Sequence, residues 1–397
     1  MEPSQDFAKL LGVYEAELLD HVVPWWLEHA IDREDGGIFY RLAQDGTLIN
    51  SEKSLWSQAR ALYMFSALYN NIGKRHEWLE AANHLFEFVL RIGRENEWRW
   101  PIQLYRDGSV KNGPGQIYAD GFAIMGMTEY ARATGDEQAI EAALATYETL
   151  QERMKTPGTH LAVPESIAQV AKCHGISMIF STVFHELGKL LDEAEILQAG
   201  YDHAVQILDQ FRRPDRQLLL EYLALDGSEL DAPEANHVNA GHAIEAMWFV
   251  MHIFRDRREM RRLDQAAECV RWHISKCWDP QYGGMSLALR NDGTVASPDA
   301  QKAHWPHGEA LYALLLAYEH TREQWCLEWF DRVQQWSFAH YPDREYGEWR
   351  ETVNRDGSVP PYDLGNPPTV HTFFHLPRAL MRCIGVLTRL AREQSKR

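Results

Sequence analysis

Histidine, arginine and carboxylate side chains stand near the starts of apolar helical patterns in this sequence. In NHVNAGHAIEAMWF, His242 and Glu245 are three residues apart and share one face of a helix that begins near Gly241. Such a histidine can serve as a general acid or base, and the nearby carboxylate would orient it and stabilise its charged form. In SLWSQARALYMF, Arg60 offers a permanent charge for a carbonyl or enolate oxygen. Structural ion pairs would explain these residues equally well.

The segment KAHWPHGEALYALL carries a different combination, an aromatic ring with a carboxylate. Trp305 and Glu309 are four residues apart, with His304 and His307 interleaved. Aromatic rings stack on sugar rings, and carboxylates hold hydroxyl groups. The segment therefore favours a sugar-binding site, although a helix start with partly exposed polar residues would read the same.

A zinc-like spacing occurs once, in TVHTFFHLPRALMRC, where His371 and His375 are four residues apart. No glutamate follows the first histidine, and no third ligand is obvious. We therefore expect no metal and no cofactor.

Two histidines, one arginine and several carboxylates suit proton transfer next to a carbonyl group. The sequence has no glycine-rich phosphate loop and no Gly-x-Ser-x-Gly segment, which argues against phosphoryl transfer and against acyl transfer. These residue types alone leave the reaction open.

The elements that must position these residues are indicated by a recurring Asp-Gly dipeptide that follows alternating polar and apolar residues. This pattern predicts β-hairpins with type I′ turns. The dipeptides are Asp45-Gly46, Asp107-Gly108, Asp226-Gly227, Asp292-Gly293 and Asp356-Gly357. Their glycines are separated by 62, 119, 66 and 64 residues, so a sixth unit without Asp-Gly is expected near TPGTHLAVPES.

Between the hairpins lie segments with apolar residues three and four apart, which predict helices. Two helices and a hairpin per unit, repeated six times, predict an all-α (α/α)6 barrel (toroid) with short hairpins at one end. We expect residues 1–397 to form a single catalytic domain. The alternative is an unrelated helical bundle with scattered loops.

Composition bounds the partners and the compartment. The formal net charge of −17 disfavours nucleic acid and anionic membranes. The N-terminus lacks a signal-peptide core, and no stretch approaches the ~20 apolar residues that span a bilayer. Five scattered cysteines without a Cys-x-x-Cys pair predict reduced, mostly buried thiols. We therefore expect a cytoplasmic protein.

Six motifs resemble, in order, those of the N-acylglucosamine 2-epimerase superfamily, which includes mannose isomerases, mannose 2-epimerases and cellobiose 2-epimerases. The resemblance covers nearly the whole chain. The motifs are WWLEHAIDREDGGIFYRLAQDG, LWSQARALYMFSALY, IYADGFAIMGMTEYA, NAGHAIEAMWFV, HWPHGEALYALLLAYE and FFHLPRAL.

The resemblance implies an (α/α)6 barrel that moves a proton at C2 of an open-chain hexose through an enediolate. His242 and His375 would be the acid/base pair, and Arg60 would bind the enediolate oxygen. Glu245 and Glu309 would orient the histidines and assist ring opening.

Substrate contacts also follow from the resemblance. The substrate would be a monosaccharide, contacted by Trp305, and a homodimer is the oligomeric state that relatives suggest. Further residues expected to contact the sugar are Trp56, Asp120, His304 and His307.

Two departures leave open which sugar is used and whether the product is an epimer or a ketose. Relatives have two tryptophans and a glutamine where this chain reads HWPHGE. Disaccharide epimerases and aldose–ketose isomerases carry a histidine where this chain has Ile179 or Phe180, which is closer to the N-acyl-sugar type. His174 or His185 would be the nearest substitutes.

Two other classes remain as alternatives. An inverting glycoside hydrolase on the same barrel needs two carboxyl groups about 6.5–9.5 Å apart, for which Asp120 and Glu309 are candidates. A non-catalytic toroid that binds a sugar or a protein would leave the acid/base set without a role.

Overall fold

Helices dominate the computed structural model, which describes residues 5–115, 117–155, 163–361 and 369–396. Six of them form an inner ring and six an outer layer in these ranges. The inner helices are α3 (Leu55–Asn71), α5 (Ile117–Thr134), α7 (His174–Leu191), α9 (Ala240–Asp256), α11 (His304–Thr321) and α13 (His375–Gln394). The outer helices are α1 (Phe7–Ala16) continued by η1 (Glu17–Val22) and α2 (Val23–His29), α4 (His76–Glu95), α6 (Glu137–Met154), α8 (Ala194–Gln206) continued by η3 (Ile207–Phe211), α10 (Met260–Cys277) and α12 (Gln324–His340).

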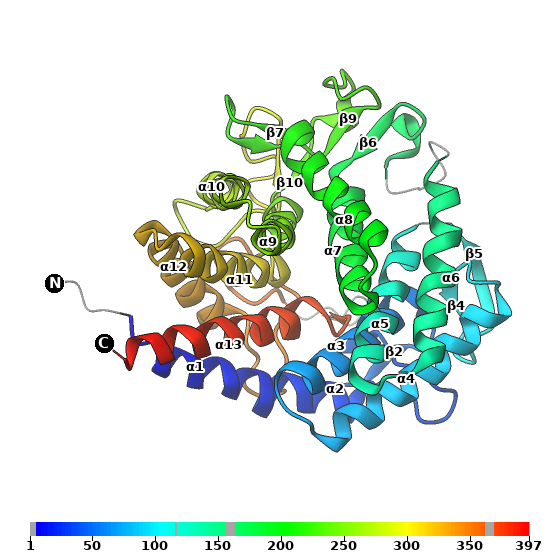
Figure 1. Ribbon diagram of the computed structural model, residues 1–397. Coiled ribbons are helices and arrows are strands. Elements are labelled where there is room, and N and C mark those ends of the chain that lie inside the picture. Colours follow the sequence, from blue (N-terminus) through cyan, green and yellow to red (C-terminus); the bar gives the residue numbers. More distant parts are fainter. Residues whose placement is uncertain (1–4, 116, 156–162, 362–368, 397) are drawn as a thin grey trace.

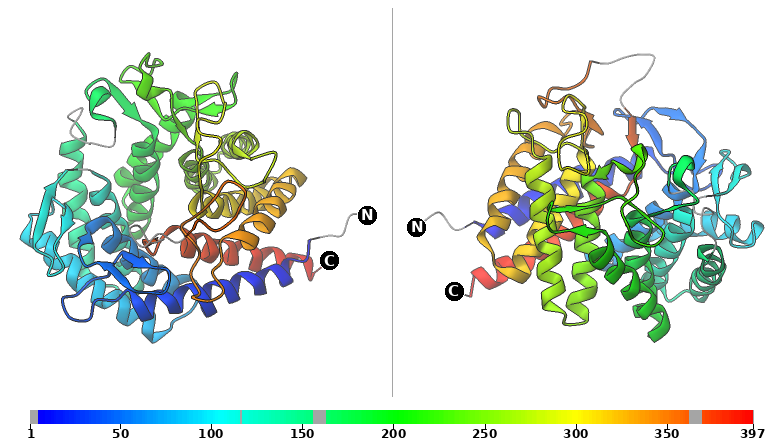
Figure 2. Two further views of the ribbon diagram at one scale, coloured as in Figure 1. Left: turned by 180° about the vertical axis from the view of Figure 1, so that it is seen from behind. Right: turned by 90° about the horizontal axis from the view of Figure 1, so that it is seen from above.

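The inner helices close into a ring. Each contacts the next in sequence, and α13 contacts α3. The first helix α1 runs beside the last, α13 (Figure 1). In the left view of Figure 2 the helix pairs follow one another around the molecule in sequence order. The predicted (α/α)6 barrel is confirmed.

Burial explains which helices lie inside. Helix α3 is buried on almost every side from Leu55 to Leu68, as expected for a helix packed between two ring neighbours and an outer helix. Helix α4 instead buries one stripe that recurs every three or four residues, including Trp78, Leu85 and Val89, and exposes the rest to solvent. The apolar periodicity therefore distinguishes the two layers.

Short strands connect the units. Five of the strands that lead into inner helices pair antiparallel with a strand of the next unit, in the pairs β3–β4, β6–β9, β10–β11, β12–β13 and β14–β1, with Leu42 opposite Val370 in the last pair. The strand before α5, β5, pairs with β4 of its own hairpin. The strands are β1 (Arg41–Ala43), β2 (Leu48–Asn50), β3 (Lys53–Ser54), β4 (Pro101–Leu104), β5 (Val110–Pro114), β6 (Ala171–Cys173), β7 (Arg212–Arg213), β8 (Leu218–Leu219), β9 (Tyr222–Ala224), β10 (Val238–Asn239), β11 (Ala288–Leu289), β12 (Lys302–Ala303), β13 (Thr352–Val353) and β14 (Thr369–His371), with 3₁₀ turns η2 (Glu165–Ile167) and η4 (Pro233–Ala235).

All five Asp-Gly dipeptides lie at turns, but the predicted turn type is wrong. Gly46 has φ +85°, whereas Asp45 is not among the residues with positive φ. The Gly46 N–H donates to the Ala43 carbonyl, and the Ala43 N–H donates to the Thr47 carbonyl. This is a type I turn followed by a left-handed glycine, the three-residue hairpin loop. The Asp45 carboxylate accepts from the Thr47 N–H, and the other four turns repeat this contact.

A buried ion pair between a lysine and an aspartate recurs in distant units, and we call it the lysine clip. Lys53 Nζ lies 2.8 Å from Asp32 Oδ2 and also donates to two backbone carbonyls of the surrounding loops. Lys302 makes the same contacts around Asp279, with Nζ 3.2 Å from Oδ2. A buried ammonium is tolerated because an ion pair and carbonyl acceptors replace its water. The clip supports the repeat inferred from the Asp-Gly spacing.

Three other expectations can be compared with the structure. Most of the segment TPGTHLAVPES, assigned to the sixth unit, lies outside the described residues. All five cysteines are buried and free, as predicted. Within the described ranges, no helix is both long and apolar enough to cross a membrane.

Candidate active site

The predicted chemical residues meet at one end of the barrel because they occupy the first two turns of inner helices. Each inner helix begins shortly after one of the short strands, so the hairpin ring fixes where these turns lie. His375 is the first residue of α13, and His242 and Trp305 lie in the first turns of α9 and α11. We call this set, with Arg60, Glu221, Glu245, Glu309 and Arg378, the front cluster.

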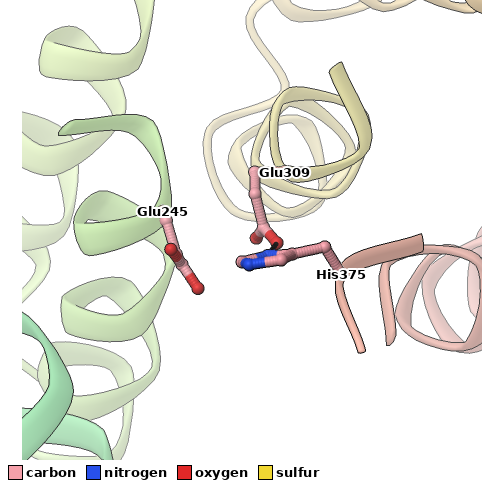
Figure 3. Close-up of side chains that lie close together, drawn as sticks. All are labelled: Glu245, Glu309 and His375. Carbon is pink, nitrogen blue, oxygen red and sulfur yellow. Dashed lines mark hydrogen bonds and ion pairs between the residues drawn. The ribbon is translucent and has the colours of Figure 1, made fainter. Parts of the chain in front are cut away.

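His375 is held by Glu309. Nδ1 of the ring lies 2.7 Å from Glu309 Oε1, and the two side chains point toward each other from neighbouring helices (Figure 3). The second carboxylate oxygen accepts from Trp248 Nε1 at 2.8 Å. Because a carboxylate can only accept, Nδ1 carries the proton and Nε2 is left for a reactant. Burial, then the positive charge of Arg60, lowers the pKa of His375 well below its ordinary value. This ring is therefore a neutral imidazole, ready to act as a base.

His242 is held by Glu221, not by Glu245 as the spacing had suggested. Its Nδ1 lies 3.4 Å from Glu221 Oε1, and its backbone N–H is capped by Asn239. Burial alone would lower the pKa of His242, but the hydrogen bond and charge of Glu221 outweigh it, so the pKa is raised. His242 therefore favours its protonated form and is ready to act as an acid.

Trp305 lies between the two histidines. Its ring centroid is 5.7 Å from that of His242 and 5.1 Å from that of His375. This position depends on Gly241, because a Cβ there would come within 2.3 Å of the indole. Trp305 thus holds the rings of His242 and His375 apart.

Arg60 is a buried cation enclosed by aromatic faces. Its guanidinium carbon lies 4.5, 4.2 and 4.3 Å from the ring centroids of Trp56, Phe122 and Phe374. Within the described part of the chain it makes no ion pair, and its buried Nε has no hydrogen-bond partner. Burial lowers its pKa to about 9, so it stays charged at neutral pH. Such a cation can receive the oxygen of an anionic intermediate.

Arg378, which the sequence did not single out, joins the two glutamates. Its Nη2 donates to Glu245 and, at 2.6 Å, to Glu309 Oε1. Glu245, Glu309 and His375 are close enough to hold a metal ion, with ligand atoms within 4.8 Å of one another (Figure 3). The guanidinium lies against both carboxylates, where a metal would have to bind. The donor set therefore fits a protein cation better than a metal. His371, the other histidine of the zinc-like pair, bonds Thr369 instead.

Two predicted substrate contacts flank the front cluster. Trp56 is partly exposed and stacks on Tyr118 and Phe122, and its buried indole N–H has no hydrogen-bond partner. His304 is largely buried, with Nδ1 3.3 Å from the Glu351 carbonyl.

The structure does not bring Asp120 and His307 into the cluster. Asp120 is fully buried and pairs with Arg153 of the outer helix α6 at 2.5 Å. His307 is also fully buried, and both ring nitrogens bond the backbone, at Ala303 and Met285. Neither side chain exposes a surface to substrate. Asp120 lies two residues before Phe122, and His307 lies two residues after Trp305. Phe122 and Trp305 are on the side of the cluster, and two residues along a helix differ in direction by about 200°, so Asp120 and His307 face away from it.

The position where some relatives have a histidine is apolar here. Ile179 and Phe180 are both buried in the core. His185 pairs with Asp256 near the other end of α7. His174, however, is fully buried with Nδ1 3.4 Å from Glu221 Oε2, and neither of its ring nitrogens has a hydrogen-bond partner. It therefore belongs to the surroundings of the front cluster.

Sequence reasoning missed Glu221 and Arg378, and it named His174 only as a substitute for the histidine of some relatives. Glu221 interrupts the apolar run LLLEYLAL, and a single acid in a buried strand segment is a usable signal. Arg378 stands in the quoted motif FFHLPRAL, three residues after His375 and on the same helical face.

The chain is similar to known proteins over most of its length. The chain is 30% identical to N-acylglucosamine 2-epimerase of Bos taurus over 98% of this chain and 94% of that protein. It is 22% identical to cellobiose 2-epimerase of Bacteroides fragilis, over 87% of this chain and 91% of that protein. The solved structure of cellobiose 2-epimerase from Bacillus thermoamylovorans has a TM-score of 0.84 at 18% identity, covering 95% of this chain and 99% of that one.

The family model for N-acylglucosamine 2-epimerase (GlcNAc 2-epimerase) matches residues 37–379, which include every member of the front cluster. The resemblance inferred from the six motifs is confirmed, and the chain belongs to the N-acylglucosamine 2-epimerase family.

Proposed function

We propose that this protein is a 2-epimerase that interconverts N-acylglucosamine and N-acylmannosamine. The observation that carries the proposal is the pair His242 and His375, which flank Trp305 and each bind a separate buried carboxylate through Nδ1. Inversion at one carbon needs a base on one face and an acid on the other. Two histidines with oppositely shifted pKa values supply both.

The proposed reaction begins with the open-chain sugar, because only that form has a carbonyl that acidifies the C2 proton. His375 Nε2 takes this proton, and the C2–H electron pair becomes the C1–C2 double bond of an enolate, because C2 of these sugars carries the acylamino group. The carbonyl oxygen gains the negative charge, which Arg60 stabilises. His242 then donates its proton to the opposite face of C2, and the aldehyde reforms. In the reverse direction the histidines exchange roles.

Three further residues position this machinery. Glu309 fixes the ring of His375, and Glu221 keeps His242 in its protonated form. Arg378 and Arg60 together balance the charges of Glu245 and Glu309, so that the enolate forms beside a cluster that is not net negative.

The substrate class rests on two supports. N-acylglucosamine 2-epimerase of Bos taurus matches at 30% identity, against 22% for the cellobiose enzyme. The resemblance places the apolar Ile179 or Phe180 where disaccharide epimerases and aldose–ketose isomerases have a histidine. We further propose a cytoplasmic enzyme that uses no cofactor or nucleic acid, with a homodimer as the oligomeric state to test.

Glycoside hydrolysis is less supported. It requires two carboxyl groups that are free to protonate the leaving group and activate water. Asp120 is bonded to Arg153, and Glu309 to His375 and Arg378.

A panel of sugars tests the proposal. Purified protein is incubated with N-acetylmannosamine, N-acetylglucosamine, mannose, fructose and cellobiose, and products are identified by proton NMR. We expect interconversion of the two N-acetyl sugars. Conversion of mannose to fructose, without reaction of the N-acetyl sugars, would overturn the proposed substrate and assign an aldose–ketose isomerase.

A further inference from the structure

A cavity lies toward the C-terminal ends of the inner helices, opposite the front cluster. Its volume is about 850 Å³, and side chains from all six inner helices line it. We call it the rear cavity. The residues that line it include Asn70, Asn71, Thr182 and Thr388, whose amide and hydroxyl groups suit a hydroxylated ligand.

The charge of the rear cavity is opposite to that of the chain. The protein has a net charge of −17, yet six cationic side chains line this cavity against two carboxylates. The cations are Arg132, Lys189, Arg255, Arg382, Arg389 and Arg392, and the carboxylates are Glu129 and Glu186. Concentrated positive charge in a concave site attracts anions.

Most of these cations are already paired. Arg132 contacts both lining carboxylates, Lys189 and Arg255 contact Asp256, and Arg389 contacts Glu319. Among the described residues, Arg382 and Arg392 have no carboxylate partner within ion-pair distance. They form a surplus of two positive charges.

Arg382 lies at the inner side of the rear cavity. Its guanidinium carbon is 6.0 Å from the Trp248 ring centroid, Nη2 donates to the Tyr63 hydroxyl at 3.2 Å, and the buried Nε has no hydrogen-bond partner among the described residues. An arginine that forms no ion pair retains its capacity for a charge-assisted bond to an oxyanion. Arg392 is exposed, ten residues further along α13.

We propose that the rear cavity is a binding site for a small hydroxylated phosphomonoester, with the phosphate on Arg382 and Arg392 nearer the rim. A phosphomonoester carries close to two negative charges at neutral pH, which matches the surplus. Inorganic phosphate shares this chemistry and serves as the simplest probe.

Arg382 and Trp248 connect the rear cavity to the front cluster. Arg382 follows Arg378 by one helical turn, and a void of about 30 Å³ is lined by both. Trp248 lines the rear cavity and donates to Glu309, which holds His375. A ligand that moves the Trp248 indole therefore changes the base of the proposed reaction.

Calorimetric titration with inorganic phosphate, and separately with glycerol 3-phosphate, tests the site at constant ionic strength set by chloride. Arg382→Gln should weaken phosphate binding about tenfold or more, because it removes a charge-assisted bond. Arg392→Glu, at an exposed position where folding is not at risk, should weaken it severalfold. Arg33→Gln is the matched control: it removes an exposed charge at the hairpin end and should bind phosphate like the wild type.

Arg60→Gln separates the rear cavity from the front cluster, where an anion could also bind. Retained phosphate binding in this variant supports the rear site. Three results would overturn the rear site. They are loss of phosphate binding in Arg60→Gln, unchanged binding in both Arg392→Glu and folded Arg382→Gln, and no heat of binding with either ligand in the wild type. Tighter binding of glycerol 3-phosphate than of phosphate identifies a hydroxylated ester, and equal affinity would reduce the site to one for free phosphate.

A kinetic arm tests the connection to the front cluster and rests on the proposed function. The kcat of the wild type should change upon saturation with phosphate, and this change should be absent in Arg392→Glu at the same concentration. If binding is measured but kcat is unaffected, the site stands and the connection through Trp248 is refuted.

Discussion

Replacing Glu221 with glutamine removes the charge that holds the proton on His242 while keeping the size of the side chain. The carboxylate is almost fully buried, and its Oε1 lies 3.4 Å from His242 Nδ1. A hydrogen bond between charged groups contributes about 1.5–3 kcal/mol. The contact is long and the His242 side chain is 33% exposed, so we take the lower end. This corresponds to a fall of about one pKa unit.

The direction of the pKa shift follows from the protonation state of His242 that Glu221 stabilises. A carboxylate favours the protonated ring, so the wild-type pKa is raised, and the variant should lose its proton at lower pH. The limb of the kcat/KM profile that requires protonated His242 should therefore move down by about one pH unit. At a pH below the His242 pKa of both proteins, the two should have similar rates. At a pH above both of these pKa values, the variant should be about tenfold slower.

The assay is a pH profile of kcat/KM together with an NMR titration of the His242 ring. Glu348→Gln is the control, because Glu348 is also a buried glutamate but bonds Trp26 and Trp349 instead of a histidine. This control should leave the profile in place. If Glu221→Gln has the same pH profile and the same His242 pKa as the wild type, Glu221 does not set the protonation of His242.

Four other outcomes are expected. Arg60→Gln should lower kcat about 10²–10³-fold with a smaller change in KM, because it removes the cation assigned to the enolate; equal kcat would refute that role. His375→Asn should lose about 10²–10⁴-fold in epimerisation, and a rate within tenfold of wild type would contradict its assignment as a base. Asp120→Asn should lower the melting temperature while preserving kcat/KM, since its partner Arg153 is structural; a large rise in KM would restore it as a substrate contact. Exhaustive chelation should leave the rate unchanged, and a loss restored by one divalent ion would assign a metal to the front cluster.

The barrel could be predicted because its repeat units share the same short turn sequence. A left-handed glycine after aspartate is needed at each hairpin, so Asp-Gly marks the unit length even where helix sequences diverge. The turn type was wrong because Asp-Gly serves both the two-residue loop and the three-residue loop. Only the hydrogen bonds around residues such as Gly46 distinguish them.

The site was predictable where residues share one helical face with a recognisable partner. Trp305 and Glu309, four residues apart, both belong to the front cluster, whereas the interleaved His307 faces α12 and stacks on Trp336. Helical geometry alone, at about 100° per residue, would have excluded it. Glu221 could not be placed in this way, because it lies between β8 and β9, outside the inner helices, and contacts His242 only in the folded chain.

Transfer of a proton at C2 is the central claim, and one NMR experiment tests it directly. N-acetylmannosamine is incubated with the protein in D₂O, and the C2 proton signals of substrate and product are followed for the wild type, His242→Asn and His375→Asn. The account predicts that the wild type forms N-acetylglucosamine carrying deuterium at C2. His242→Asn, which retains the base, should exchange the C2 proton without forming the epimer, and His375→Asn should do neither. Epimer that retains its C2 proton, or inversion at wild-type rate in either variant, would contradict it.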